Sequence, residues 1–166
     1  MEQQEELGGQ IRFLKRSWDG QEFSVLLESL RNQVYANDLI KVFTNSAVVE
    51  QGGFVGSFET GIMTPSGGTR KIRHGAILVA TGTMEYRPEL YGLGQQDNVV
   101  TQTDFEAMLT KQSEPVELPE HVVMIQCVGS RCSDYLNYCS RICCNQAIKN
   151  SLKLKELNPE ARVDVI

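Results

Sequence analysis

The chain has 166 residues, enough for one ordinary hydrophobic core or for parts of two domains. Its 16 Lys and Arg and 21 Asp and Glu give a net charge of -5, and no basic stripe indicates a nucleic-acid-binding surface. The longest apolar run, "GAILVA", is far shorter than the roughly 20 residues of a membrane-spanning helix. The acidic, polar start "MEQQEELGG" has no secretory-signal pattern, so a cytoplasmic protein is expected.

The first half of the chain alternates between helical and strand patterns. We expect Asp19 to cap a helix whose apolar residues recur at helical spacing, namely Phe23, Leu26, Leu27, Leu30 and Val34. "IKVFTN" and "SAVVE" are expected strands. "FVGSFETGIM" (residues 54–63) and "RKIRH" are expected to form a β-hairpin around the turn residues "TPSGG". "GAILVATG" is a continuous apolar run that predicts a strand buried on both faces.

The second half begins with an irregular connection. "TDFEAMLTKQ" predicts a helix capped by Thr103 or Asp104, and the proline-containing "SEPVELPE" at 113–120 is the expected domain boundary. "HVVMIQ" is an expected strand, followed by the cysteines, a helix from about Ser140 to Leu157, and the strand "ARVDVI". Strand, turn, helix and strand together predict a βαβ unit that opens a doubly wound domain.

All five cysteines lie in eighteen residues, "CVGSRCSDYLNYCSRICC". On the expected helix, Cys139 and Cys143 are four residues apart and share one face, and Cys144 flanks the same point. Cys127 ends the preceding strand, so four sulfurs can converge at the strand-to-helix junction. Backbone N–H groups and the helix dipole favour anions at such a junction, and thiolates or an anionic cluster meet that requirement.

The spacing alone leaves several sites open. Iron–sulfur clusters are usually held by four thiolates, whereas zinc sites usually draw on paired C-x2-4-C spacings, which this run lacks. A thiol–disulfide site and buried structural thiols are the remaining interpretations. Because there are five cysteines for four positions, Cys132 competes for a place.

The segments "VVMIQCVGSR", "YCSRICC" and "KLKELNPEARVDVI" resemble the A subunit of heterodisulfide reductase, an iron–sulfur flavoprotein family. The segments "ELGG", "GGFVGSFET", "GAILVATG", "YGLG" and "NVVTQTDFEAML" fit the same family. The resemblance implies FAD and a 4Fe-4S cluster on a lone upstream cysteine, a further cysteine and a Cys-Cys pair. Carried onto this chain, the cluster ligands are Cys127, Cys139, Cys143 and Cys144, with Cys132 as the alternative.

The same resemblance implies a set of flavin-binding residues. An acid that binds the adenosine ribose, a Gly-Gly pair, a position whose backbone meets the adenine and a closing "ATG" motif correspond to Glu2, Gly8, Gly9, Val48, Ala80, Thr81 and Gly82. No catalytic residue can be named. Arg131 and Arg141 flank the thiols and would either offset cluster charge or be solvated loop residues.

The implied fold class is α/β, with partial FAD/NAD-linked, thioredoxin reductase-like doubly wound domains and an antiparallel β-hairpin insertion. Residues 1–112 would be a partial FAD-binding domain without its GxGxxG strand-turn, 113–120 a linker, and 121–166 the start of a second Rossmann-like βαβ unit. The chain would then be a piece of a larger polypeptide. Its exposed strand edges would favour homo-oligomers.

The implied function is electron transfer between FAD and the cluster in a multi-subunit, electron-bifurcating complex. Its partners would be other heterodisulfide reductase-type subunits and a hydrogenase or other electron donor. Two alternatives of other classes are a zinc-stabilised binding module and a thiol–disulfide oxidoreductase of the thioredoxin reductase kind. The second alternative lacks the C-x2-C pair that it would need.

Overall fold

A computed structural model describes residues 1–17, 19–110 and 118–166. The chain is a mixed α/β protein that divides into two compact units. The first unit comprises residues 1–12 and 24–83, and the second comprises residues 13–23 and 84–166. The predicted linker at 113–120 lies largely outside the described residues, and a domain division at that point stays a prediction.

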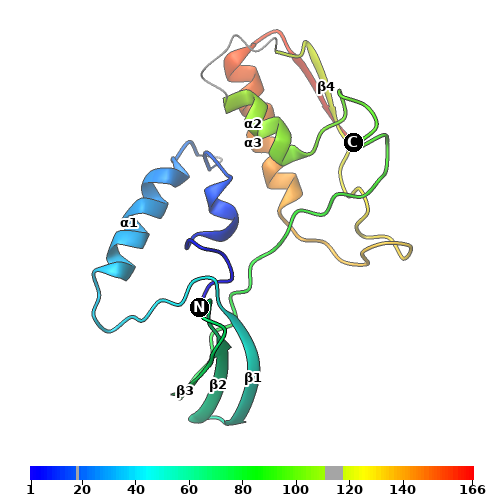
Figure 1. Cartoon of the computed structure of the whole chain (residues 1–166). Coiled ribbons are helices and arrows are strands. Elements are labelled where there is room, and N and C mark those ends of the chain that lie inside the picture. The colour runs from blue at the N-terminus through cyan, green and yellow to red at the C-terminus, as the bar shows by residue number, and fades with distance from the viewer. Residues whose placement is uncertain (18, 111–117) are drawn as a thin grey trace. The chain divides into compact units, whose positions relative to one another are not determined.

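The first unit contains a three-stranded antiparallel sheet in the order β1 (Ala47–Phe54), β2 (Ser57–Met63), β3 (Thr69–His74) (Figure 1). The predicted hairpin is confirmed between β2 and β3. The strand predicted over 54–63 is interrupted at the turn that joins β1 to β2, and "SAVVE" begins a strand longer than expected. The central strand β2 carries the buried residues of the sheet, because its two neighbours cover it on both edges.

The predicted helix of the first half is confirmed as α1 (Phe23–Tyr35), and a short 3-10 turn, η1 (Gly9–Arg12), precedes it. Asp19 does not cap α1. It lies in a tight turn in which the Ser17 hydroxyl donates to its carboxylate and the Ser17 N–H donates to the Gln21 carbonyl over 2.9 Å. The helix begins four residues later, so the capping prediction is wrong.

Two strands predicted for the first unit are absent. "IKVFTN" is irregular, because Asn45 has a φ of 47° and the Phe43 carbonyl accepts from the N–H of Glu2. "GAILVATG" is not buried, since Leu78 is 95% and Val79 81% exposed. A strand is held by backbone hydrogen bonds to a neighbour, and the described residues supply none to the backbone N–H groups of 76–82. Both predictions are therefore wrong.

In the second unit the βαβ prediction is confirmed. The strands β4 (His121–Met124) and β5 (Arg162–Val165) pair in parallel, with α3 (Cys143–Leu157) between them in sequence. A further helix, α2 (Gln102–Thr110), packs against α3. These four elements and their connections enclose one hydrophobic core, made of Phe105, Leu109, Met124, Ala147, Leu154 and Ala161.

Both helices of the second unit begin at residues other than those predicted. The cap of α2 is Thr101, whose hydroxyl accepts from the Asp104 N–H and donates to the Asp104 carboxylate. Neither Thr103 nor Asp104 is the cap. The helix α3 begins at Cys143 instead of Ser140, because Arg141 has a left-handed φ of 61° that a continuing helix cannot accommodate.

Among the described residues, no helix is both long enough and apolar enough to span a membrane.

Candidate functional site

The cysteine segment leaves β4 as a closed loop, drawn in yellow to orange in Figure 1. The Ser130 N–H donates to the Cys127 carbonyl over 3.0 Å, which makes a tight turn directly at the first cysteine. Further along, the Arg131 N–H donates to the Tyr138 carbonyl over 3.3 Å. The second bond draws Tyr138, next to Cys139, back toward the turn that begins at Cys127.

The backbone of this segment is strained. Cys127, Arg131 and Arg141 all have left-handed φ values, of 57°, 56° and 61°. Such conformations cost non-glycine residues of order 1–3 kcal/mol each, and they persist only where surrounding contacts impose them. In addition, Gln126 Oε1 is buried without a hydrogen-bond donor among the described residues. Strain and unpaired polar atoms concentrate at binding sites, so the segment is built for something other than stability.

Cys143 and Cys144 are the first two residues of α3. The residue before them, Ile142, makes no side-chain cap, so the first N–H groups of the helix have no capping side chain. The positive end of the helix dipole therefore lies at the two cysteines, as at other helix N-termini. Cys139 precedes the helix instead of standing on it, and its sulfur accepts from the Arg141 N–H over 3.3 Å.

Three of the other cysteines influence Cys144. The pKa of Cys144 is raised, mainly by the charge of Cys143, then by burial and a hydrogen bond with Cys143, and then by the charges of Cys127 and Cys139. Neighbouring thiolates repel, so each one makes the next harder to ionise. A bound cation reverses this effect, because metal charge favours the thiolate form. Cys132 is exposed on the loop.

The described side chains do not form a ready site for a single metal ion. Within the described ranges, no three His, Cys, Asp or Glu side chains surround one point closely enough to hold a metal ion. A zinc ion needs its sulfurs about 2.3 Å from the metal. An iron–sulfur cluster binds each thiolate through a different iron, so its ligands surround a larger volume. Thiols divided between the Cys127 turn, Cys139 and the first turn of α3 are compatible with that requirement.

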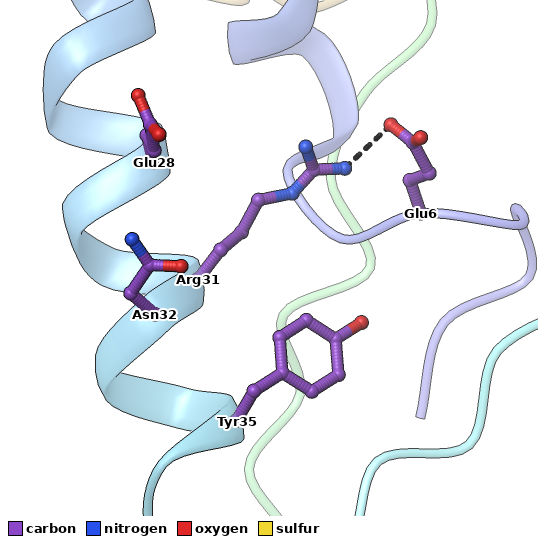
Figure 2. Close-up of a pocket in the computed structure, with 5 residues that line it drawn as sticks. All are labelled: Glu6, Glu28, Arg31, Asn32 and Tyr35. Carbon is purple, nitrogen blue, oxygen red and sulfur yellow. Dashed lines mark hydrogen bonds and ion pairs between the residues drawn. The ribbon is translucent and has the colours of Figure 1, made fainter.

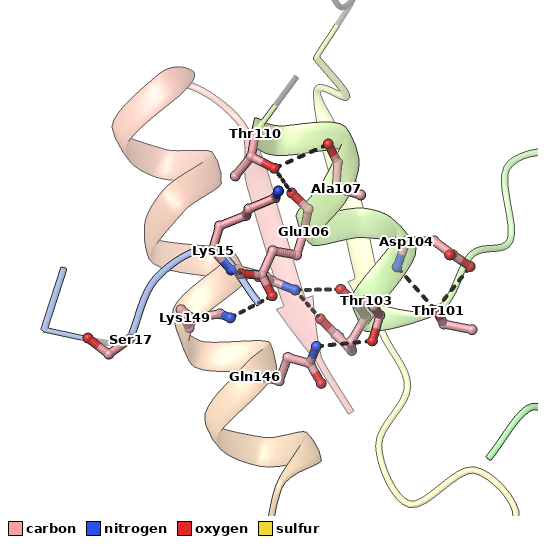
Figure 3. Close-up of polar contacts among 12 residues, drawn as sticks. Lys15, Ser17, Thr101, Thr103, Asp104, Glu106, Ala107, Thr110, Gln146 and Lys149 are labelled. Atoms are coloured by element: carbon pink, nitrogen blue, oxygen red, sulfur yellow. Dashed lines mark hydrogen bonds and ion pairs between the residues drawn. The ribbon is translucent and has the colours of Figure 1, made fainter. Parts of the chain in front are cut away.

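The helix that carries Cys143 and Cys144 is fixed by buried polar contacts to α2 (Figure 3). Lys149 and Glu106 form an ion pair of 2.6 Å, with side chains only 13% and 5% exposed. The fully buried Asn150 donates to the Gln102 side chain and carbonyl over 2.8 and 2.9 Å. The Lys15 backbone N–H donates a further hydrogen bond to the Glu106 carboxylate over 2.9 Å. These contacts escaped the sequence analysis, although the acid within the apolar "FEAML" was a signal of a buried ion pair.

The predicted flavin residues all belong to the first unit. The backbone of Glu2 bonds Phe43 and Ser46, and its carboxylate accepts from the Gln4 N–H over 3.0 Å. A Cβ at Gly8 would lie 2.7 Å from Cδ1 of Leu27, so the glycine is what allows α1 to approach this turn.

The remaining residues predicted to bind flavin are exposed, or have free space beside their backbone. No atom lies within 4 Å of a Cβ placed at Gly9, and Val48 on β1 is 50% exposed. The "ATG" residues Ala80, Thr81 and Gly82 are also exposed.

Two side chains missed by the sequence analysis connect these motifs. The Gln10 amide donates to the Thr83 carbonyl over 2.9 Å and so joins the Gly-Gly turn to the residue that follows "ATG". Arg31 donates to the Glu6 carboxylate over 2.6 Å and to the Leu7 carbonyl over 3.0 Å. The hydrogen bond from Arg31 to the Glu6 carboxylate, together with the charges of Arg31 and Arg12, lowers the pKa of Glu6.

Arg31 also lines an open polar pocket beside the "ELGG" turn (Figure 2), together with Glu6, Glu28, Asn32 and Tyr35. Within a long amphipathic helix, a single arginine carries no signal by which the sequence could have indicated this role.

Known proteins resemble the chain strongly over part of its length. The first iron-sulfur A subunit of the CoB–CoM heterodisulfide reductase of Methanopyrus kandleri is 37% identical over 110 residues, covering 56% of this chain and 16% of that protein. The A subunit of the H2/formate:CoB-CoM heterodisulfide,ferredoxin reductase of Methanococcus maripaludis is 38% identical over 105 residues, 55% of this chain and 16% of that protein. The A subunit of the ferredoxin/F420H2-dependent CoB-CoM heterodisulfide reductase of Methanosarcina acetivorans is 38% identical over 104 residues, which cover 55% of this chain and 13% of that protein.

The resemblance to the A subunit of heterodisulfide reductase is thereby confirmed over about half of the chain. Other curated proteins from methanogens with 36–37% identity carry names of the same kind. No protein-family model matches the chain. The chain spans between 13% and 16% of the length of the three relatives described above.

Proposed function

We propose that this chain is part of an oxidoreductase of the heterodisulfide reductase A-subunit type, and that it carries electrons between FAD and a 4Fe-4S cluster. The observation that supports the proposal is that the charges of Cys127, Cys139 and Cys143 all act on Cys144, which stands in the first turn of α3. The similarity to proteins named as iron-sulfur A subunits supports the choice of metal.

In this proposal the cluster ligands are Cys127, Cys139, Cys143 and Cys144, and Cys132 is left outside the ligand set. A bound cluster supplies one-electron redox chemistry. The protein contributes position and electrostatics. The tight turn at Cys127 and the first turn of α3 hold three of the sulfurs, and the Arg141 N–H donates to Cys139. Hydrogen bonds to sulfur and a nearby helix N-terminus stabilise a reduced, more negative site.

The flavin side of the proposal assigns FAD to the first unit. Glu2 would bind the adenosine ribose, Val48 would meet the adenine through its backbone, and the remaining contacts would come from Gly8, Gly9, Ala80, Thr81 and Gly82. A bound flavin supplies two-electron chemistry. The Gln10–Thr83 hydrogen bond supports this assignment, because it joins two of the motifs across 73 positions of sequence.

The partners belong to the same proposal. Relatives are named for ferredoxin, hydrogen, formate or F420H2 as reaction partners of the heterodisulfide reductase. For this chain we propose other heterodisulfide reductase-type subunits and a hydrogenase or another electron donor, within a cytoplasmic, electron-bifurcating complex. An interface with a second copy of the chain is part of the proposal as well.

Anaerobic reconstitution tests the cluster. The chain should take up roughly four irons and four sulfides, and replacement of Cys139, Cys143 or Cys144 by Ala should abolish the uptake. The matched control is Cys132→Ala, which removes a thiol from the same loop and should leave the iron content unchanged.

Two results would contradict the cluster proposal in different ways. Stoichiometric zinc without sulfide would favour the zinc-stabilised binding module. Loss of iron in Cys132→Ala, with retention in Cys127→Ala, would move the upstream ligand to Cys132.

The flavin assignment has its own test. The sequence contains no GxGxxG, so we expect millimolar FAD to raise the melting temperature only slightly. The gain should stay well below the about 2.7 kcal/mol of a ligand at 100 times its Kd, and it should shrink further in Glu2→Ala. An equal FAD response in Glu2→Ala would remove Glu2 from the site.

A further inference from the structure

The turn at Cys127 is packed beneath an aromatic ring from a distant segment. Gly129, two residues after the cysteine, is buried and has a left-handed φ of 66°. A Cβ placed there would lie 2.5 Å from Cε1 of Tyr86 and 3.2 Å from Cγ of Pro88. The Tyr86 ring edge therefore occupies the space that any other residue type at this position would need. The contact works only with glycine on one side and a ring on the other.

The segment that carries Tyr86 is anchored to the first turn of α2. Arg87 forms ion pairs of 2.9 Å with both Glu85 and Asp104. Asp104 is itself held by two hydrogen bonds with the Thr101 hydroxyl (Figure 3). Its carboxylate is thus fixed before it meets Arg87, which reduces the side-chain entropy lost in forming the pair. Tyr86 is attached next to an anchor point that the helix start determines.

The helix α2 also holds α3, which carries the cysteine pair. Through Glu106–Lys149 and Gln102–Asn150, α2 is joined to α3. The helix α3 begins with the cysteine pair, whereas Gly129 belongs to the turn of the upstream cysteine. The helix α2 therefore touches both halves of the site: it holds α3 directly, and it holds the Cys127 turn through Arg87 and Tyr86.

We propose that Tyr86 is a positioning residue for the thiol site: its ring, seated on Gly129, fixes the turn of Cys127 at the distance from Cys143 and Cys144 that a shared ligand requires. The ring also covers one side of the turn and keeps water from it. The identity of that ligand as a cluster rests on the proposed function, whereas the positioning of the turn does not.

Thiol reactivity in the metal-free protein tests the positioning directly. Alkylation of each cysteine is followed by mass spectrometry under native conditions. In Tyr86→Ala we expect alkylation of Cys127 to rise on the order of tenfold, as for a segment whose local opening has become easier, while Cys132 stays unchanged. Tyr86→Phe should behave like the wild type, because the ring and not the hydroxyl makes the contact.

Tyr91→Ala is the matched control, since Tyr91 lies in the same connection and is 66% exposed. It should leave Cys127 reactivity as in the wild type. An unchanged Cys127 rate in Tyr86→Ala would overturn the proposal. Faster alkylation of all five cysteines would also overturn it, because that result would indicate general unfolding.

A second set of variants separates the clash from backbone strain. Gly129→Ala introduces both, whereas Gly94→Ala introduces only strain, since Gly94 has a φ of 79° and no atom within 4 Å of its Cβ position. We expect Gly129→Ala to expose Cys127 and Gly94→Ala to have no effect on it. The double variant Gly129→Ala with Tyr86→Ala should show less than the two single effects combined, because the clash with the ring is gone and only the backbone strain at Gly129 remains. If the double variant combined the full effects of both single changes, the ring would not be seated on Gly129.

Iron release distinguishes this inference from the proposed function. In reconstituted protein, Tyr86→Ala should lose iron to a chelator several-fold faster than Tyr91→Ala. A chain that binds no iron but shows the Tyr86-dependent change at Cys127 would refute the cluster and retain the positioning role. Iron binding with identical release rates in the two variants would refute the positioning role and retain the cluster.

Discussion

In the second unit, α2, α3 and the two parallel strands enclose six buried apolar side chains, whereas the first unit buries one, Ile62, among the described residues. This difference in buried apolar side chains arises because a helix packs on the sheet of the second unit, whereas apolar residues at the sheet of the first unit remain exposed. The β4–β5 pair is packed against α3, which in turn packs against α2. The antiparallel sheet of the first unit leaves Phe54 and Val55 at its turn, and Leu78 and Val79 beyond β3, exposed to solvent.

The thiol site takes its stability from the core of the second unit. Its strained turns, at Cys127 and Arg141, lie between elements that share a complete small core. That core supplies the free energy that keeps left-handed residues in place. The flavin-related residues have no such support within the described part of the chain. Burial of apolar surface contributes about 25 cal/mol per Å², and much of the apolar surface of the first unit remains in water.

The largest expected effect breaks the second unit alone. Glu106→Ala leaves the Lys149 ammonium nearly buried without a partner, and we expect a loss of about 4 kcal/mol, since breaking a buried pair from one side costs about 3–5 kcal/mol. Native-state hydrogen exchange, read separately for the two units, measures it. The control is Glu59→Ala in the first unit, which removes an exposed pair with Lys71 and should change exchange very little. Equal effects from the two variants would contradict the comparison.

A second expected effect concerns the cores directly. Leu154 is completely buried, so Leu154→Ala should destabilise the second unit by about 3 kcal/mol through lost burial and an unfilled cavity. Leu78→Ala changes a side chain that is 95% exposed and should leave the stability of the isolated chain within about 0.5 kcal/mol. Urea unfolding followed by circular dichroism measures both. A loss of more than about 1 kcal/mol in Leu78→Ala would show that its segment is packed in solution.

A third expected effect is confined to the sheet of the first unit. In the first unit, the Thr60 hydroxyl lies 2.7 Å from Nε2 of His74, and this contact joins β2 to β3. Thr60→Val keeps the shape but leaves the ring nitrogen unpaired, which should cost about 1 kcal/mol. The change should appear only in exchange of β2 and β3 amides. Equally faster exchange in α3 would indicate that the two units unfold together.

The sequence best predicted those elements whose pairing partners lie close to them in the same chain. The βαβ unit was predictable because "HVVMIQ" and "ARVDVI" pair with each other and the intervening helix carries its own apolar stripe. The hairpin of β2 and β3 was predictable for the same reason, with "TPSGG" as a strong turn signal. "GAILVATG" has the composition of a buried strand, but composition cannot supply the neighbouring strand that makes one.

The sequence shows the thiols of the candidate site but not the contacts that hold their segments. The charges of Cys127, Cys139 and Cys143 do act on Cys144, whereas the choice of cluster ligands stays a prediction. The expected start of α3 at Ser140 failed because a left-handed Arg141 depends on the closed loop around it. Tyr86, Arg87 and the buried pair on α2 were missed, because each depends on a contact between segments far apart in sequence. No local pattern encodes such contacts.

The smallest expected effect is a pH dependence confined to the anchor of Tyr86. The hydrogen bond from Arg87 lowers the pKa of Asp104 below its ordinary value of about 3.9. A carboxylate with a lowered folded-state pKa contributes stability above the unfolded-state pKa and loses it as the pH falls through the folded-state pKa. The wild type should therefore be slightly more stable than Asp104→Asn above about pH 4, and the difference should vanish on further acidification.

Unfolding of both proteins at a series of pH values, in the metal-free state, measures this difference. Glu6→Gln is the counterpart in the first unit, since Arg31 lowers the pKa of Glu6 in the same way. Its acid-dependent loss should appear only in exchange of first-unit amides, because Arg31 holds only the "ELGG" turn there. A difference between the wild type and Asp104→Asn that grew with acidification would mean that the carboxylate destabilises the folded state. In that case Arg87 could not be the anchor that keeps Tyr86 on the cysteine turn.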